Sequence, residues 1–396
     1  MTSLLPQHAG RSAHPPRVPG GTDAEPTLDT WQDAPHNRWA FAHVAEFVPT
    51  APIAHRPAEE SVRPVIGLSG LAAVPDLVKR LEQSYTDALV VVRDGAIVAE
   101  HYRDGVDPDG VHLLMSVSKS ICGLTVGTLV DEGLVDVERR VDEYVPELAG
   151  SAYGDATVQQ VLDMTVDVDY DEDYRNPASE VQAQDRIAGW RPRVADDPAD
   201  MYSFLAGLRG GGRHGERFMY CSAGTDVLAW MVENVTGLRY PDAVSRRLWS
   251  KLGCEHDAQI TVDAVGFGFA NGGISCTARD LTRVGRLMLD GGVIDGRRVV
   301  SAEWVQRTLE GGDPNAASGT VFHRVHPGGA YANQWWLTRS VRSDYYAAGI
   351  HGQFIWVDPG TRTVVVKFSS WPEPVTEAWN RLHARLFRDL CDAIDS

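Results

Sequence analysis

Two stretches of apolar and β-branched residues, one in each half of the chain, predict paired β-strands. Residues 87–102 (DALVVVRDGAIVAEHY) contain two apolar runs joined by Arg93-Asp94-Gly95, which is a strong hairpin signal. Residues 353–371 (QFIWVDPGTRTVVVKFSSW) repeat the pattern around a turn at 358–361. Because both ends of the chain supply hairpins, we expect an antiparallel sheet that is built from both ends.

Between these hairpins, apolar residues recur every three or four positions, which is typical of helices that bury one face. Residues 116–132 are mostly small and apolar and are followed by Gly133, which predicts a buried helix with a glycine at its end. From about residue 137 to 262, helical patterns alternate with loops rich in Asp, Gly and Pro. Residues 376–394 predict a final amphipathic helix with Leu382, Leu386 and Leu390 on its apolar stripe.

This order of elements predicts an α/β (α+β) fold, with an antiparallel sheet flanked by helices. We expect residues 26–136 and 263–396 to form the domain that contains the sheet, and residues 137–262 to form an inserted, mainly helical domain. Residues 1–25 are rich in Pro, Gly, His and Arg and are expected to form an arm over the surface. The cleft between the two domains is the natural place for a ligand.

The charge balance of the chain narrows the classes of partner. With 54 acidic against 37 basic residues, the formal net charge is −17, which is the wrong sign for binding a nucleic-acid backbone. This charge favours neutral or cationic small substrates. No metal-ligand cluster and no phosphate-binding glycine-rich loop stands out in the sequence, so we expect no cofactor.

Targeting signals and cysteines bear on the compartment. No stretch of about 18 apolar residues is present, so we expect no membrane span, and the N-terminal residues lack the apolar core of a secretion signal. The five cysteines (Cys122, Cys221, Cys254, Cys276 and Cys391) are scattered, which favours reduced thiols over disulfides. These features together predict a cytoplasmic protein.

The main candidate for chemistry is Ser116-Val117-Ser118-Lys119 at the start of the predicted buried helix. Residues three apart lie on one helix face, so Ser116 and Lys119 are expected to contact each other. Burial disfavours the charged form of a lysine, and a neutral amine can accept the proton of a serine hydroxyl. The alternative for such a common spacing is a serine cap followed by a lysine that reaches solvent.

Two further segments extend this hypothesis. Tyr220-Cys221-Ser222 precedes a helical run, where the phenol of Tyr220 can pass a proton to a leaving group; alternatively, Tyr220 is a core residue and Ser222 caps the helix. The strand predicted over residues 345–357 contains Gly349-Ile350-His351-Gly352, whose glycines allow a substrate close to the backbone. Exposed N–H groups there can hold an oxyanion, while His351 can equally be a hydrogen-bonded residue of a bulge.

These three segments, in this order and at these separations, resemble the serine β-lactamase and D,D-peptidase superfamily, and within it the class C-like esterases. The likeness extends over nearly the whole chain to the nylon-oligomer hydrolases, which are amidases that also act as carboxylesterases. It includes residues 31–41, 113–123, 177–190, 220–230, 266–280 and 349–353. The resemblance implies a β-lactamase-like fold, a homodimer, and cleavage of the amide bond of linear 6-aminohexanoate dimer and of short carboxylic esters.

The resemblance also implies a catalytic role for four residues. Ser116 is acylated, Lys119 accepts its proton, and Tyr220 relays a proton to the leaving amine. The backbone N–H groups of Ser116 and Ile350 form the oxyanion hole.

Four side chains are implied in substrate binding. Tyr174, on a loop over residues 167–177, closes over the substrate and hydrogen-bonds the amide nitrogen. Asp185 pairs with the ammonium group of the substrate, Asn271 supports amide cleavage near the leaving group, and Trp336 lines the pocket. From the residues alone, a solvated loop remains the alternative for Tyr174 and Asp185, and a turn for Asn271.

The chain departs from the family pattern at two places. Gly224 stands where the family has Asn, and we expect it to loosen the turn after Tyr220. In β-lactamases and D,D-carboxypeptidases the third segment carries Lys or His followed by Thr-Gly, whereas this chain has Gly349-Ile350-His351-Gly352. A β-lactamase or peptidase is therefore the less favoured enzyme, a general carboxylesterase remains open, and a sensor domain that is acylated without turnover is the alternative outside catalysis.

Overall fold

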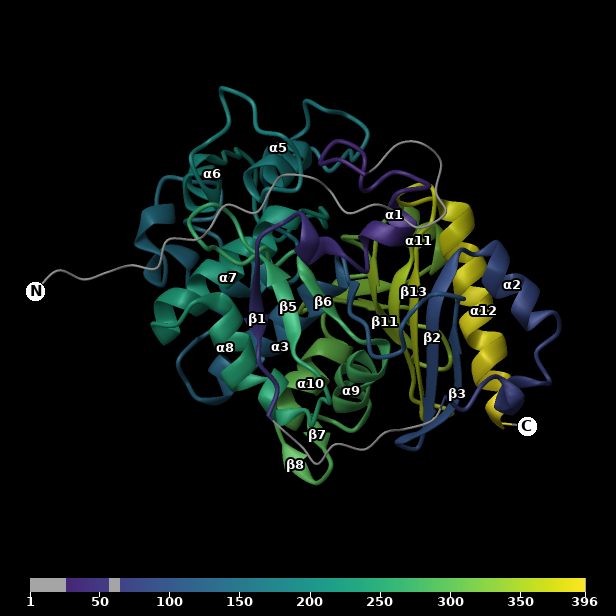
Figure 1. Ribbon diagram of the computed structural model, residues 1–396. Helices are drawn as coiled ribbons and strands as arrows, with labels where there is room; N and C mark the ends of the chain where they lie inside the picture. The colour runs from purple at the N-terminus through teal and green to yellow at the C-terminus, as the bar shows by residue number, and fades with distance from the viewer. Residues whose placement is uncertain (1–25, 57–64, 396) are drawn as a thin grey trace, which may run out of the picture.

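A seven-stranded antiparallel sheet dominates the computed structural model, which describes residues 26–56 and 65–395 (Figure 1). The arm predicted over residues 1–25 lies outside the described residues. The strand order is β3-β2-β13-β12-β11-β10-β9. The strands are β2 (Thr86–Arg93), β3 (Ala96–Tyr102), β9 (Ala330–Ala332), β10 (Trp335–Leu337), β11 (Tyr345–Gly349), β12 (Gln353–Asp358) and β13 (Thr363–Ser369).

Both predicted hairpins are confirmed. The chain reverses between β2 and β3 at Asp94 and Gly95, whose φ angles of 48° and 82° are those of a tight hairpin turn. The second hairpin joins β12 to β13. Strand β13 then pairs with β2, and this pairing joins the two ends of the chain in one sheet, as expected.

Helices cover both faces of this sheet. α9 (Ala278–Leu289) packs against β2, β12 and β13 on one face, and α12 (Glu377–Asp395) lies along the other, where Phe387 contacts Phe354 and Trp356. The prediction of the final helix is confirmed, but the placement of Leu382 on its apolar stripe is wrong, because this side chain is 38% exposed. The other two leucines of the stripe, Leu386 and Leu390, are buried together with His383, Ala384, Phe387 and Cys391.

A second sheet was not anticipated from the sequence. Its strand order is β1-β5-β6-β4, with β1 (Thr50–Ile53), β4 (His112–Leu113), β5 (Ala258–Thr261) and β6 (Ile274–Cys276). β5 falls inside the segment expected to be mainly helical, yet it pairs with β1 and β6 from the flanking segments. Strand pairing therefore crosses the boundary expected at residue 262, and the division into domains stays a prediction.

The remaining elements lie mostly in the middle of the chain. The other helices are α1 (Asn37–Ala40), α2 (Leu77–Gln83), α3 (Val117–Asp131), α4 (Val158–Leu162), α5 (Glu180–Ile187), α6 (Met201–Gly207), α7 (Ser222–Thr236), α8 (Tyr240–Arg247), α10 (Ala302–Glu310) and α11 (Val321–Val325). Strands β7 (Val293–Ile294) and β8 (Arg297–Arg298) form a small hairpin. Short 3-10 helices occupy Val44–Glu46, Ser69–Leu71, Val141–Glu143, Pro146–Leu148 and Trp249–Lys251.

Helix α3 runs through the centre of the molecule, and nearly all of its residues are buried, as predicted (Figure 1). Two glycines allow its close packing. A Cβ atom on Gly123 would lie 2.4 Å from the carbonyl oxygen of Asn333, and one on Gly127 would lie 2.4 Å from Nε1 of Trp304. The small residues that mark this segment in the sequence therefore bring its N-terminus, with Ser116, into the interior.

Gly224 lies in the first turn of α7 and is buried, so it belongs to a helix and not to a flexible turn. A Cβ atom there would lie 3.4 Å from Cγ1 of Val161 and 3.6 Å from the ring of Tyr153, which are ordinary contact distances. We predict that Gly224→Ala raises the free energy of unfolding by up to about 1 kcal/mol, because alanine favours the helix. Urea unfolding measures the change. Gly127→Ala is the comparison variant and should be less stable than the parent protein in the same assay, because its Cβ atom would clash with Trp304.

Candidate active site

Ser116 occupies the N-terminal end of α3, directly after a strained residue. Met115 has a φ of 48°, a left-handed conformation that is uncommon for a side chain of this size. This turn leads the chain from β4 into α3 and places Ser116 on the wall of a cavity. The serine is accessible, whereas the residues that follow it are buried.

Lys119 lies one helical turn further and is 1% exposed. Its Nζ atom is 2.8 Å from Oγ of Ser116 and donates a hydrogen bond to the carbonyl oxygen of Asn271, also at 2.8 Å. Burial lowers the pKa of Lys119 to about 8, while the carboxylates of Glu172 and Asp226 oppose the shift. The Asn271 carbonyl fixes one N–H, so the lone pair of the neutral amine can face the Ser116 hydroxyl.

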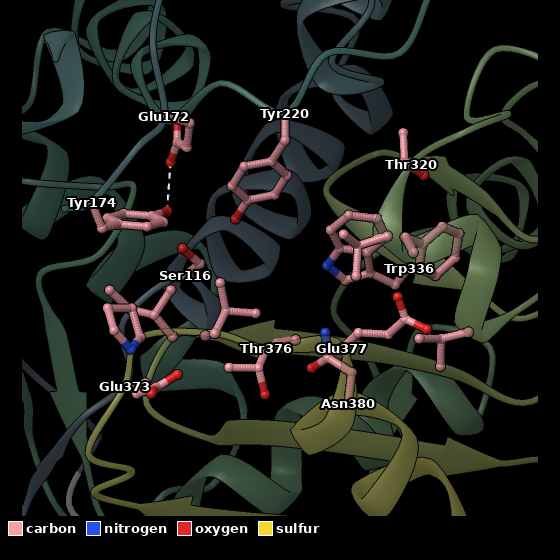
Figure 2. A pocket seen from close by; sticks show the side chains of 18 of the residues that line it. Ser116, Glu172, Tyr174, Tyr220, Thr320, Trp336, Glu373, Thr376, Glu377 and Asn380 are labelled. Carbon is pink, nitrogen blue, oxygen red and sulfur yellow. Dashed lines mark hydrogen bonds between the residues drawn. The ribbon is translucent and has the colours of Figure 1, made fainter. Parts of the chain in front are cut away.

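Tyr220 approaches the same serine from the segment that precedes α7. Its ring stacks on Trp336 at a centroid distance of 5.6 Å, and Nζ of Lys119 lies 5.2 Å from its centroid. The phenolic oxygen points toward Ser116 (Figure 2). Burial and the charge of Glu172 raise the pKa of Tyr220, so the phenol is protonated near neutral pH. Ser116, Lys119 and Tyr220 are thus brought together, as the sequence predicted.

Ser116 and Ile350, whose backbone amides were predicted to form the oxyanion hole, both line the cavity. A Cβ atom on Gly349, at the end of β11, would lie only 2.9 Å from the backbone nitrogen of Ser116, so the two segments are in direct contact. Ile350 follows Gly349 and lines the cavity. Within the described part of the chain, neither the Ser116 nor the Ile350 amide donates to a protein carbonyl. Both N–H groups are therefore available to an oxyanion.

The continuous strand predicted over residues 345–357 is wrong, because the chain reverses inside it. His351 and Gly352 have φ angles of 59° and 92°, and this left-handed pair separates β11 from β12. His351 is buried with its Nδ1 atom 2.8 Å from the carbonyl oxygen of Trp371. Burial lowers the pKa of His351 to about 4, so the ring is neutral near pH 7. Its contact with Trp371 stabilises the turn between β11 and β12.

The cavity beside Ser116 has a volume of about 740 Å³. Its lining includes four other residues predicted for the site, Tyr174, Tyr220, Trp336 and Ile350. Much of the remaining wall is aromatic, formed by Phe218, Phe322, Tyr346, Phe354 and Trp371, and the lining also includes acidic side chains. This shape and lining suit a small substrate with apolar parts.

Asp185 and Asn271 do not line this cavity. Asp185 is buried, with Oδ2 3.5 Å from Nε of Arg191 and 3.4 Å from Nε2 of Gln32, and burial raises its pKa to about 6. The side chain of Asn271 donates to Oδ2 of Asp226 at 2.7 Å, so its carbonyl, and not its amide group, contacts Lys119. The roles of Asp185 and Asn271 in substrate binding stay predictions.

Sequence reasoning missed Asp226, which is completely buried in α7. Its carboxylate accepts the backbone N–H of Asn271 at 3.0 Å and an N–H of Gln184 at 2.5 Å, in addition to the Asn271 side chain. Burial raises the pKa of Asp226 to about 7. Asp226 thus fixes the position of Asn271, and the carbonyl oxygen of Asn271 in turn accepts a hydrogen bond from Lys119. The signal in the sequence was a single acid inside the apolar run TDVLAWMV.

A second buried lysine shows that desolvation alone does not make a catalytic site. Lys367, on β13, is fully buried; burial lowers its pKa to about 7, and its Nζ atom contacts Oγ of Ser369. Both side chains lie outside the cavity lining, and both are fully buried. Lys367 and Ser369 thus also form a contact between an amine and a hydroxyl. Of the two serines, Ser116 is accessible from the cavity and Ser369 is not.

Comparisons with known proteins agree with this geometry. The family model described as Beta-lactamase matches residues 76–387. Across 384 residues, the chain is 56% identical to the 6-aminohexanoate-dimer hydrolase of Paenarthrobacter ureafaciens, covering 97% of this chain and 98% of that protein. A Bacillus anthracis structure, provisionally described as a 6-aminohexanoate-dimer hydrolase, superposes with a TM-score of 0.84 at 28% identity, covering 93% and 97% of the two chains.

A family VIII carboxylesterase shares the fold, with a TM-score of 0.60 at 16% identity and coverage of 83% and 100% of the two chains. The chain therefore belongs to the Beta-lactamase family and is a serine hydrolase. Within that family, its similarity to the Paenarthrobacter enzyme covers nearly the full length of both proteins. Among the described residues, no helix has the length and apolar character needed to cross a bilayer.

The buried amine leads to a prediction about pH. If Lys119 is the base, only its neutral form is active, so kcat/KM for an ester should rise with pH up to about 8 and then level off. Lys119→Arg should lower kcat/KM by at least about 10²-fold, because arginine stays protonated. The exposed Lys79→Arg is the matched control and should keep the parental pH profile. Parental turnover in Lys119→Arg would exclude this residue as the base.

Proposed function

We propose that this protein hydrolyses short linear aminoacyl amides, such as the 6-aminohexanoate dimer, and short carboxylic esters through an acyl-enzyme at Ser116. The observation that carries the proposal is the 2.8 Å contact between Nζ of Lys119 and Oγ of Ser116 on the wall of a cavity that Tyr220 also lines. The similarity to a named amidase over nearly the whole chain supports the choice of substrate class.

Acylation forms one bond to the carbonyl carbon, breaks another and requires three proton transfers. Oγ of Ser116 bonds to the substrate carbonyl carbon while its proton passes to the neutral amine of Lys119. The N–H groups of Ser116 and Ile350 stabilise the oxyanion. The bond from the carbonyl carbon to the leaving nitrogen or oxygen then breaks as Tyr220 donates its phenolic proton, which the Lys119 ammonium replaces.

Deacylation reverses these roles with water. A water molecule attacks the acyl carbon and gives one proton to Lys119 as its oxygen bonds to that carbon. The bond to Ser116 then breaks, and Oγ recovers its proton. The net reaction consumes one water and releases a carboxylic acid and an amine or alcohol. No cofactor takes part in these steps.

Substrate recognition in this proposal combines an apolar wall with a charge. The stacked rings of Trp336 and Tyr220 contact the methylene chain of the substrate. Asp185 lies outside the cavity lining, and in this proposal it binds the ammonium group after that group displaces Arg191, which lies 3.5 Å from the carboxylate. A cytoplasmic location and a homodimer, which the resemblance implies, stay predictions.

A panel of three substrates tests the reaction class. We expect the purified protein to hydrolyse the 6-aminohexanoate dimer and p-nitrophenyl acetate, and to turn over a cephalosporin slowly or not at all, because the third segment lacks the Thr of β-lactamases. Ser116→Ala should abolish the dimer and ester activities. Loss of both establishes the nucleophile; steady turnover in that variant, or preferred cleavage of the cephalosporin, contradicts the proposal.

The role of Asp185 is tested by removing the charge on either partner. Asp185→Asn should lower kcat/KM for the dimer by about tenfold or more, the scale of a charge-assisted hydrogen bond, and should largely spare p-nitrophenyl acetate. The N-acetylated dimer, which has no ammonium group, should be equally poor for both proteins. A loss of the same size on dimer and ester would assign Asp185 to the structure of the site and not to recognition.

A further inference from the structure

Glu172 is a cavity-lining carboxylate whose contacts are all hydrogen-bond donors. Its Oε1 atom accepts the phenolic O–H of Tyr174 at 2.6 Å and the hydroxyl of Ser222 at 2.5 Å, and its Oε2 atom accepts the backbone N–H of Ser222 at 2.9 Å. Ser222 is the first residue of the fifteen-residue helix α7. The N-terminus of this helix stabilises a negative charge at Glu172. Ser222, which the sequence offered as an alternative helix cap, is instead the first residue of α7, and its backbone N–H is bound by Glu172 from another loop.

Two other glutamates that line this cavity form ion pairs with arginines, whereas Glu172 does not. Glu373 lies 3.1 Å from Arg175, and Glu377 pairs with Arg324 and Arg381. Among the described residues, Glu172 forms no ion pair within 4 Å and instead contacts Tyr174, whose ring lies beside Ser116 and Tyr220 on the cavity wall (Figure 2). Its position therefore connects the helix N-terminus to the reacting groups.

The contact with Glu172 fixes the direction of the hydrogen bond that Tyr174 can offer to a substrate. Burial and the charge of Glu172 raise the pKa of Tyr174, so the phenol stays protonated. Its O–H donates a hydrogen bond to the carboxylate of Glu172. A phenol has one donor hydrogen. Once that hydrogen is engaged, the oxygen of Tyr174 presents only acceptor lone pairs to the cavity.

Amides and esters differ in this respect at the scissile bond. An amide carries an N–H, which can donate to the oxygen of Tyr174, whereas the corresponding ester oxygen has no hydrogen and would face it lone pair to lone pair. A buried acceptor left without a donor costs more than a single hydrogen bond contributes. A tyrosine locked as an acceptor therefore favours the amide over the ester.

We propose that Glu172 is a positioning residue that makes Tyr174 a hydrogen-bond acceptor toward the substrate and so sets the preference for amide over ester leaving groups. This inference rests on the proposed function, in which Tyr174 contacts the scissile nitrogen. Glutamine at this position reverses the polarity: its Oε1 can accept the N–H of Ser222, while its Nε2 donates to Tyr174. The phenolic hydrogen is then free to donate to an ester oxygen.

The test uses p-nitroacetanilide and p-nitrophenyl acetate, which differ only in N–H against O at the scissile position. Glu172→Gln should lower the ratio of kcat/KM for the anilide to that for the ester by about tenfold, with ester hydrolysis kept or increased. Glu180→Gln is the matched control: it removes a carboxylate that accepts the backbone N–H of Asp171 in the same loop, outside the cavity lining. The ratio in this control should equal the parental one.

A role of Glu172 confined to capping α7 would lower both activities by the same factor, so an unchanged ratio in Glu172→Gln overturns the proposal. Tyr174→Phe gives a second measurement that does not disturb the cap. It should lower the same ratio, and the double variant should match Tyr174→Phe, because no phenol remains to be oriented. Equal losses on both substrates in Tyr174→Phe also overturn the proposal.

Failure of the proposed function gives a different result from failure of this inference. If Ser116→Ala kept both activities, the proposed mechanism would fail whatever the ratios show. If Ser116→Ala abolished both activities and Glu172→Gln left the ratio unchanged, the nucleophile would stand and only the role of Glu172 would be rejected.

Discussion

The proposed chemistry of this protein depends on the burial of one amine, that of Lys119, beside one hydroxyl, that of Ser116. Lys119 is enclosed because α3 passes through the centre of the molecule, and α3 can do so because Gly123 and Gly127 leave no side chain between it and its neighbours. Burial disfavours the ammonium form, while nearby carboxylates favour it, and the balance leaves a pKa of about 8. An amine with this pKa is a base near neutral pH and still carries a proton often enough to return it.

Access separates this pair from the other buried lysine of the chain. Lys367 also contacts a hydroxyl, and burial lowers its pKa as it lowers that of Lys119. Ser116 lies at a helix N-terminus on the wall of a cavity, whereas Ser369 is enclosed within a sheet. The strained residue Met115 and the end of β11 at Gly349 lie directly before Ser116 and Ile350. These two residues carry the backbone N–H groups proposed for the oxyanion hole.

Acidic groups organise the site from two directions. Asp226, behind Lys119, holds Asn271 and through it the amine. Glu172, in front of it, holds Tyr174 and the start of α7. Neither carboxylate forms an ion pair within 4 Å among the described residues; each accepts hydrogen bonds from N–H or O–H donors instead.

The sequence by itself determined the elements whose cause is local. Two apolar runs with Asp94-Gly95 between them specify a hairpin, and a run of small apolar residues after Ser116 specifies a buried helix that carries Lys119 on the same face. Only the tertiary structure decided which distant groups meet: β5 with β1, Glu172 with Ser222, Asp226 with Asn271. The reversal at His351 and the engaged side chains of Asp185 and Asn271 were also settled there. Periodicity reports which side of an element is buried, but a hydrogen-bond partner 45 or 50 residues away leaves no mark on local spacing.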